Sequence, residues 1–132
     1  MTQRTLLPPG WPRPKGYSNG ISARGRTIYT AGVVGWDEQE RFVADALPAQ
    51  FAQILRNIVA ILAEDGAGPE HLVRLTCYVT DRDSYVAGLA EIGAQWKAII
   101  GRHYPAMALV EVSRLVEPRA MVEIEATAVV SE

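Results

Sequence analysis

Apolar residues along this chain repeat with two periods, and the pattern predicts both helices and strands. The stretch 45–65 is the clearest helix, since its apolar residues recur at the spacing i, i+3, i+4 and i+7. They are Phe51, Ile54, Leu55, Ile58, Ile61 and Leu62. Asp45 is the expected N-cap, Pro48 suits the first turn, and Gly66 suits the end of the helix.

A second helix is predicted from Asp81 or Asp83, either of which could cap it, to about Ile100. Its apolar stripe consists of Tyr85, Leu89, Ile92, Trp96 and Ile99. Between the two helices, the stretch 71–80 alternates with a period of two and is predicted as a strand. One face of that strand carries Val73, Leu75, Cys77 and Val79.

The first third of the chain predicts strands after a polar arm. Residues 1–16 are rich in proline and glycine, and within them 5–7 could pair as an edge strand. Residues 17–30 are predicted to form a hairpin with its turn at 23–26. The stretch 31–36 continues as a strand but carries two glycines, which often mark a bulge or a close approach of other atoms to the backbone.

The stretch 104–130 is predicted as two strands joined by a turn at 117–119. The second strand places Glu123 and Glu125 on one face of an otherwise apolar segment. A buried charge is costly unless it is paired or hydrogen-bonded. This strand therefore lines a polar cavity, carries a structural hydrogen-bond network, or keeps one face in water.

The order of these elements indicates an α+β sandwich, because two amphipathic helices can cover only one face of such a sheet. On the strand before the last turn, Val110 and Val112 point to one side and Leu109 to the other, so neither side is plainly polar. We therefore expect sheets from several copies to pack on one another.

Length and charge narrow the classes of function. The 132 residues suit one domain spanning 1–132, with 1–16 as an N-terminal arm. The net charge of −2 gives no electrostatic basis for binding nucleic acid or an anionic membrane. No stretch is apolar enough for a membrane span, and the polar start does not suit a signal peptide. The single cysteine, Cys77, and the lack of any metal-ligand spacing predict a cytoplasmic protein without a metal.

The residues resemble the RidA/YjgF family of reactive intermediate deaminases over nearly the whole chain. The C-terminal signature is the most specific part: Pro-Ala, a strand, and then a strand of alternating hydrophobic and glutamate residues ending in alanine. The matching segments are GYSNG at 16–20, IYTAG at 28–32, LRNIVAIL at 55–62, VRLTCYVTD at 73–81, and YPAMALVEV to VEIEA at 104–126.

The resemblance implies a chorismate-mutase-like fold, with a mixed sheet carrying two helices on one face. It implies a homotrimer whose sheets pack into a central barrel, with clefts between subunits. It also implies hydrolysis of a small-molecule enamine or imine to a carbonyl compound and ammonia, without metal or organic cofactor. Older family names suggest ribonuclease action, which the charge of this chain does not support.

Three positions match the site residues of the family. Tyr17 corresponds to a site tyrosine near the N-terminus. Gly32 corresponds to a glycine whose backbone N–H faces the ligand. Glu123 corresponds to the glutamate that holds or activates the attacking water.

Three other positions depart from the family pattern. Met107 stands where an arginine grips the substrate carboxylate, Gly93 where an asparagine lies near the substrate, and Leu109 where a cysteine follows the arginine. A charge-assisted hydrogen bond contributes about 1.5–3 kcal/mol, so the loss of arginine matters most. The substrate lacks that carboxylate, another group holds it, or the site no longer catalyses. His103 is one candidate replacement; Arg102 and Arg114 are others.

Each candidate also has a plain structural interpretation. A strand glutamate commonly faces solvent, Glu125 is expected to be structural, and Gly32 could be a bulge. Met107 and Leu109 could simply fill the core. The rival functions are an imine deaminase, a trimer that binds a metabolite or a protein without catalysis, and a nuclease.

Overall fold

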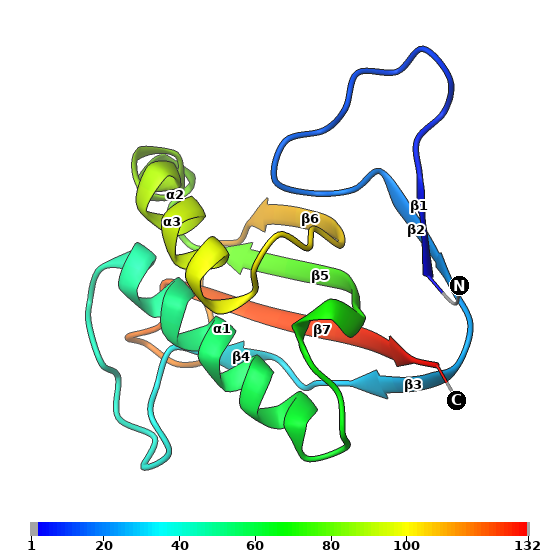
Figure 1. The fold of residues 1–132 in the computed structure, drawn as a ribbon. Coiled ribbons are helices and arrows are strands. Elements are labelled where there is room, and N and C mark those ends of the chain that lie inside the picture. Colours follow the sequence, from blue (N-terminus) through cyan, green and yellow to red (C-terminus); the bar gives the residue numbers. More distant parts are fainter. Residues whose placement is uncertain (1–2, 132) are drawn as a thin grey trace.

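A mixed β-sheet forms the centre of the computed structural model, which describes residues 3–131. Its strands lie in the order β3-β7-β5-β6, and β4 pairs with the other end of β7 (Figure 1). Strands β5 and β6 run parallel, and the other pairs are antiparallel. The strands are β3 (Arg26–Tyr29), β4 (Val33–Val34), β5 (Leu72–Val79), β6 (Ala106–Glu111) and β7 (Val122–Val130).

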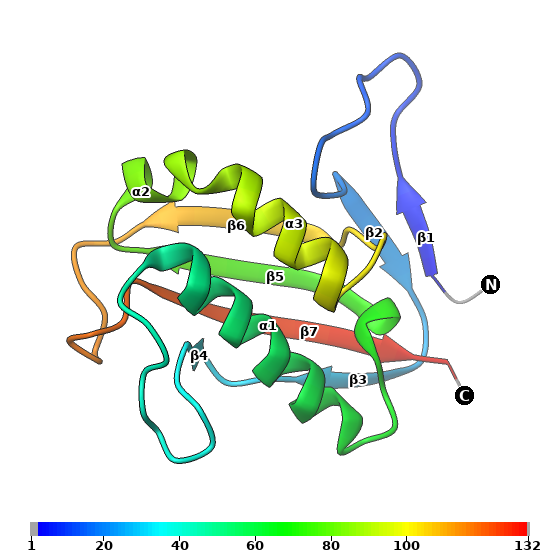
Figure 2. The ribbon, with the colours of Figure 1, turned by 60° about the vertical axis from the view of Figure 1, so that its left-hand side comes forward.

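Helices cover one face of this sheet, which confirms the predicted α+β architecture (Figure 2). They are α1 (Leu47–Ala63), α2 (Arg82–Ala87) and α3 (Leu89–Ile99), with a 3₁₀ turn at Pro69–His71. The single second helix that the sequence predicted is therefore interrupted, at Gly88. A Cβ at Gly88 would lie 2.6 Å from Cγ of Pro48, so α1 approaches the chain closely at this break. No helix within residues 3–131 is long and apolar enough to cross a membrane.

The predicted stripe of α1 packs on the sheet and forms the core. Ile54, Leu55, Ile58 and Leu62 are fully buried against strand residues that include Leu75 and Ile124. Burying a side chain of this size contributes about 1.5–3 kcal/mol. Ile61 was also expected in the stripe but is 41% exposed, because it lies at the edge of the apolar face.

The predicted N-cap of α1 is wrong. The helix begins at Leu47, its N-cap is Ala46, and no side chain caps it. Asp45 lies one residue too early, and its carboxylate instead pairs with the Arg119 guanidinium at 2.5 Å. Pro48 does lie in the first turn, as expected.

Gln50 is a buried polar residue that the hydrophobic pattern did not reveal. Its side-chain nitrogen donates to the carbonyl oxygens of Ala44 at 2.9 Å and Arg119 at 3.0 Å, and its oxygen accepts from the Met121 N–H at 2.8 Å. The amide is fully buried. Gln50 therefore ties α1 to the loop that leads into β7.

The predicted hairpin at 17–30 is wrong. β2 (Gly20–Ala23) pairs with β1 (Gln3–Leu6) in a separate two-stranded sheet, while β3 pairs with β7 (Figures 1 and 2). At Gly25 φ is +146°, and a Cβ there would lie 2.0 Å from the Val130 carbonyl oxygen. This glycine lets the chain pass close to β7 and change sheets. The edge strand expected at 5–7 is confirmed, shifted by one or two residues.

The predicted C-terminal hairpin is also wrong, because β5 lies between β6 and β7. The connection through α2 and α3 brings β6 alongside β5 in parallel, as a helical crossover commonly does. The segment 112–121 then crosses the end of β5 instead of forming a tight turn. Because β5 lies between them, candidate site residues on β6 and β7 are not on neighbouring strands.

Asp81 caps α2, and this cap should contribute to stability in a pH-dependent way. Its carboxylate accepts from the N–H groups of Asp83 at 3.0 Å and Ser84 at 3.2 Å. Bonds from Ser84 come first among the causes that hold the pKa of Asp81 below its usual value. The contribution is therefore full above the unfolded pKa of about 3.9 and disappears as pH falls through the folded pKa.

We expect Asp81→Ala to lower the melting temperature at pH 7, and the gap from wild type to close as pH falls below about 4. Thermal unfolding followed by circular dichroism between pH 7 and pH 3 measures this gap. Asp83→Ala is the matched control, since that carboxylate accepts no bond from a helix N–H. An equal gap for both variants at pH 7 would contradict the capping role.

Candidate functional site

Glu123 and Gly32 lie against each other at one edge of the sheet. Glu123 is on β7, and Gly32 lies in the break between β3 and β4. A Cβ at position 32 would stand 2.3 Å from Oε2 of Glu123. A side chain at position 32 would force the carboxylate to move, so the glycine predicted to mark a close approach does so.

The two glutamates of β7 have different surroundings. Glu125 accepts a hydrogen bond from the Tyr78 hydroxyl at 3.0 Å. This bond is the first cause that raises the pKa of Tyr78, followed by burial and by the negative charges of Glu125 and Glu123. The Glu123 carboxylate forms no hydrogen bond or ion pair with any of residues 3–131. Glu125 thus has a structural partner, and Glu123 is left available.

A second group of predicted residues borders a cavity of about 370 Å³ on the helical side of the molecule. Tyr17 directly follows the arm, Gly93 lies on α3 and Met107 lies on β6. At Gly93, no described atom outside the neighbouring residues and backbone of its own helix lies within 4 Å of the position that a Cβ would take. Three residues that are distant in sequence therefore meet at one cavity.

The walls of this cavity are mostly aromatic and aliphatic. The rings of Trp96 and Tyr104 are stacked, with centroids 6.1 Å apart and planes 11° apart. Phe51 and Tyr85 form a tilted pair at 6.3 Å. Burial is the first cause that raises the pKa of Tyr85. The cavity therefore suits an apolar or aromatic group.

One chain does not bring Glu123 and Met107 together. Met107 lies opposite Leu75 in the register, on the face that packs against the helices. Glu123 lies opposite Tyr78, on the open face. The predicted pairing of the two strands in 104–130, which would have placed Met107 on the strand beside Glu123, is wrong because β5 separates them. The chain therefore carries two groups of candidate site residues on opposite faces of the sheet.

The open face itself is mixed rather than uniformly apolar. Val110 and Tyr29 are 45% and 75% exposed. Polar side chains, among them Thr76 and Glu125, lie on the same face between them. This face therefore presents both apolar surface and hydrogen-bonding groups.

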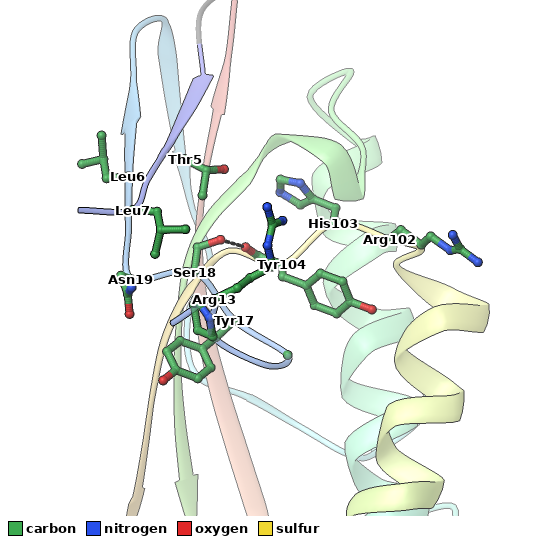
Figure 3. A pocket seen from close by; sticks show the side chains of 12 residues that line it. Thr5, Leu6, Leu7, Arg13, Tyr17, Ser18, Asn19, Arg102, His103 and Tyr104 are labelled. Carbon is green, nitrogen blue, oxygen red and sulfur yellow. Dashed lines mark hydrogen bonds between the residues drawn. The ribbon is translucent and has the colours of Figure 1, made fainter. Parts of the chain in front are cut away.

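His103 has a structural role in the described chain. Its Nε2 lies 2.6 Å from the Leu72 carbonyl oxygen, and its own carbonyl accepts a bond from the Trp96 indole N–H at 3.1 Å. It borders a different cavity of about 600 Å³ beneath the N-terminal arm, together with Arg102 (Figure 3). Neither residue lines the cavity that contains Met107.

Tyr17 lies where the two cavities meet, and it is held there by its neighbour. Figure 3 shows Tyr17, Ser18 and Tyr104 side by side at the junction of the arm with β6. The Ser18 hydroxyl donates to the Tyr104 carbonyl oxygen, and the Ser18 N–H donates to that of Pro105 at 3.0 Å. The arm is thus attached at the residue next to Tyr17, a residue that is 43% exposed.

The remaining candidates lie outside both groups of residues. Leu109 faces the core opposite Cys77, which agrees with the interpretation that it fills the core. Arg114 borders a third cavity, formed by the loop 113–121. Burial raises the pKa of the Cys77 thiol to about 12, which makes it a poor nucleophile. Among residues 3–131, no group of three His, Cys, Asp or Glu side chains is arranged to hold a metal ion.

Two lysines that the sequence reasoning missed also border the aromatic cavity. Lys97 lies on α3 four residues after Gly93, and Lys15 lies in the arm two residues before Tyr17. The spacing of four places Lys97 and Gly93 on one face of the helix. Lys97 could therefore have been linked to Gly93 from the helical period alone.

Comparison with known proteins gives consistent matches along the chain. Residues 12–130 match the family model described as endoribonuclease L-PSP. A RutC family protein from Synechocystis is 32% identical over 132 residues, covering 98% of both chains. A protein of Salmonella typhimurium named 2-iminobutanoate/2-iminopropanoate deaminase is 32% identical over 116 residues, covering 86% of both chains.

Solved structures agree with these matches. A Rid family protein of unknown function from Yersinia pestis superposes with a TM-score of 0.86 at 34% identity, covering 98% of this chain and 100% of that one. A protein named RidA, from an Antarctic Psychrobacter, superposes with a TM-score of 0.69 at 28% identity, covering 96% and 99%.

Proposed function

The chain belongs to the RidA/YjgF family, whose model is described as endoribonuclease L-PSP, and we propose that it hydrolyses a reactive imine or enamine to a carbonyl compound and ammonia. The reaction needs no metal or organic cofactor. The site lies between subunits of a homotrimer, each subunit supplying one of the two groups of residues as a half-site. The relative named as an imine deaminase supports the reaction type.

The observation that carries this proposal is the available carboxylate of Glu123 against the backbone of Gly32. A carboxylate without an internal partner can bind a water molecule and accept its proton. The glycine backbone beside it leaves its N–H accessible to a polar atom of the substrate. A general base placed in this way accelerates a reaction by about 10²- to 10⁴-fold.

The proposed chemistry balances without a cofactor. An enamine first tautomerises to the imine. The oxygen of the water held by Glu123 adds to the carbon of the C=N bond, while Glu123 takes a water proton and passes it to the nitrogen. The C–N bond of the resulting carbinolamine then breaks. The hydroxyl proton moves to the departing nitrogen through Glu123, which leaves a C=O group and ammonia.

The second half-site supplies binding. The cavity beside Met107 is large enough for a small organic molecule and lies on the opposite face from Glu123. A neighbouring copy presenting Glu123 at the mouth of this cavity would complete the site. Tyr17, 43% exposed at the same mouth, would close it from the side of the arm.

Substitution of Met107 tests whether this cavity holds the substrate. Methionine cannot form the two-pronged bond that arginine forms with a carboxylate. We therefore expect Met107→Arg to raise kcat/KM for small imino acids such as 2-iminobutanoate by about tenfold or more. An amino acid oxidase generates the imine in place, and the hydrolysis rate is read as loss of trapping by semicarbazide.

The matched control is Val116→Arg, which adds an arginine at a loop residue that is 93% exposed and lies outside the cavity. An equal gain in both variants would mean that added charge alone is responsible. If wild type is inactive on every imine tried and Met107→Arg is active, then hydrolysis of small imino acids is not the native activity.

A second candidate function is a trimer that binds a small metabolite without catalysis. Met107 and Gly93 favour it, since neither supplies a polar side chain to the cavity. Binding alone predicts thermal stabilisation by ligands with no turnover of any imine. RNA cleavage, which the name of the family model suggests, is disfavoured by the net charge of −2. An RNA-binding assay at modest salt tests it.

A further inference from the structure

We propose that the cavity beside Met107 selects a carbon-rich imine that carries a carboxylate, with its apolar part between the aromatic walls and its carboxylate at Lys97 and Lys15. The proposal rests on the proposed function for the reaction, and it adds the class of substrate. Both lysines border the cavity. They line the same cavity as Met107, which stands where the family resemblance implies an arginine.

The walls define the apolar part of the ligand. The stacked pair of Trp96 and Tyr104 and the tilted pair of Phe51 and Tyr85 line the same space as Met107. A cavity of about 370 Å³ exceeds what a two- or three-carbon imino acid would fill. A group of the size of a phenyl ring or a branched alkyl chain would displace water from these walls and contact them on both sides.

The two lysines define the charged part of the ligand. Both are exposed, and neither forms an ion pair with a carboxylate among residues 3–131. They come from different parts of the fold, Lys97 from α3 and Lys15 from the arm, yet both reach the rim of one cavity (Figure 2 shows α3 lying over β6). Two cations at the rim of an otherwise apolar cavity complement a ligand with one anionic end.

The role of the lysines differs from that of a guanidinium. An ammonium group is a point charge on a flexible stem and does not impose a planar geometry on its partner. It can therefore follow carboxylates at different distances from the reacting carbon. This role explains the methionine at position 107, where the family has arginine. Methionine extends the apolar wall of the cavity, and the cation that binds the carboxylate lies at the rim of the cavity instead of in its wall.

Binding of stable probes tests the substrate class without turnover. The probes are 3-phenylpropionate, its uncharged counterpart 3-phenylpropanamide, and butyrate, which has the charge without the ring. We expect 3-phenylpropionate to bind wild type about tenfold more tightly than either of the others, measured by calorimetry at low salt. Equal affinity for the acid and the amide, or for the acid and butyrate, would overturn the proposal.

Lysine variants test whether the two lysines at the rim of the cavity cause the preference for the acid over the amide. Lys97→Gln is expected to weaken binding of 3-phenylpropionate about tenfold and to leave binding of the amide unchanged, while Lys97→Arg keeps the preference. Lys15→Gln should act in the same direction. Arg56→Gln removes a cation from the exposed face of α1, away from the cavity, and serves as the matched control. A loss in Arg56→Gln equal to that in Lys97→Gln would overturn the role of Lys97.

Kinetics separate failure of this proposal from failure of the proposed function. We expect the imine of phenylalanine to be hydrolysed with a higher kcat/KM than that of alanine, and Lys97→Gln to raise KM with little change in kcat. Hydrolysis of both imines without this preference would overturn the substrate class and leave the deaminase intact. Selective binding of 3-phenylpropionate without hydrolysis of any imine would instead overturn the deaminase and support the ligand class.

Discussion

Replacing Glu123 with glutamine is expected to lower kcat/KM for imine hydrolysis by about 10²- to 10⁴-fold, because the amide cannot accept a proton from water. The change keeps the size of the side chain, and Glu123 has no hydrogen bond within residues 3–131 that the substitution would break. Stability should therefore be nearly unchanged. Hydrolysis of oxidase-generated imines, measured beside thermal unfolding, gives both values for the same preparation.

Glu125→Gln is the matched control, since it lies on the same strand and the same face. Glutamine at 125 can still accept the Tyr78 hydroxyl bond, so activity should stay within a few-fold of wild type. Gly32→Ala provides an independent check, because its methyl would lie 2.3 Å from Oε2 of Glu123 and force the carboxylate to move. Full activity in Glu123→Gln would remove Glu123 from the mechanism.

The largest loss of stability from one polar substitution is expected at Gln50. Gln50→Leu removes three hydrogen bonds between α1 and the backbone of two loops. Each buried or half-buried group left unpaired costs about 1–3 kcal/mol, partly recovered by water and relaxation, so we expect a loss of about 2–4 kcal/mol. Urea unfolding at one fixed protein concentration measures it.

Gln95→Leu is the control for this change. Gln95 is half-buried on α3 and forms no side-chain hydrogen bond within the described chain, so its substitution should change stability by less than about 1 kcal/mol. Because the loop held by Gln50 leads into Glu123, we also expect Gln50→Leu to reduce activity under conditions where it is still folded. Equal stability of the two variants would contradict the role of Gln50.

Sequence periodicity predicted those helices and strands in which the residues that face the core recur regularly within one segment. The stripe of α1 is borne out apart from Ile61, and the alternation of β5 is borne out from Leu75 to Val79, because each follows directly from which side of the element faces the core. The prediction for Val73 is wrong, because a β-bulge between Leu72 and Arg74 buries Leu72 in its place. The positions at the edge of a stripe, such as Ile61, depend on how far the neighbouring elements extend. That extent is a property of the packed fold and not of the segment.

Strand neighbours were the main error, and the reason is physical. The sequence suggests hairpins wherever two strands follow each other across a glycine or a proline, as at Gly25 and Pro118. In the fold, β2 pairs with β1 in the separate two-stranded sheet. β6 pairs with β5 in parallel, after the helical crossover through α2 and α3. Nothing in the local sequence distinguishes these arrangements.

The sequence named candidate site residues one by one, but it did not predict how they group in the fold. Gly32 and Glu123 do meet, and so do Tyr17, Gly93 and Met107. That the two groups lie on opposite faces depends on β5 lying between β6 and β7, which the sequence did not reveal. Lys15 and Lys97 were missed because an exposed lysine carries no pattern until the cavity beside it is known.

The central claim is that one site is built from the Glu123 half of one subunit and the cavity half of its neighbour, and mixed oligomers test it most directly. Glu123→Gln removes one half. Gly93→Trp removes the other, since the cavity is open at Gly93 and a tryptophan there would fill it. Each variant alone should be nearly inactive in imine hydrolysis.

The decisive measurement is the activity of the two variants after they are unfolded together at a 1:1 ratio and refolded, with mixed oligomers verified by native mass spectrometry. Random assembly gives about one site in four an intact Glu123 and an intact cavity, so we expect about a quarter of wild-type activity to return. If mixed oligomers form and remain as inactive as the two parents, the site does not lie between subunits and the account is wrong.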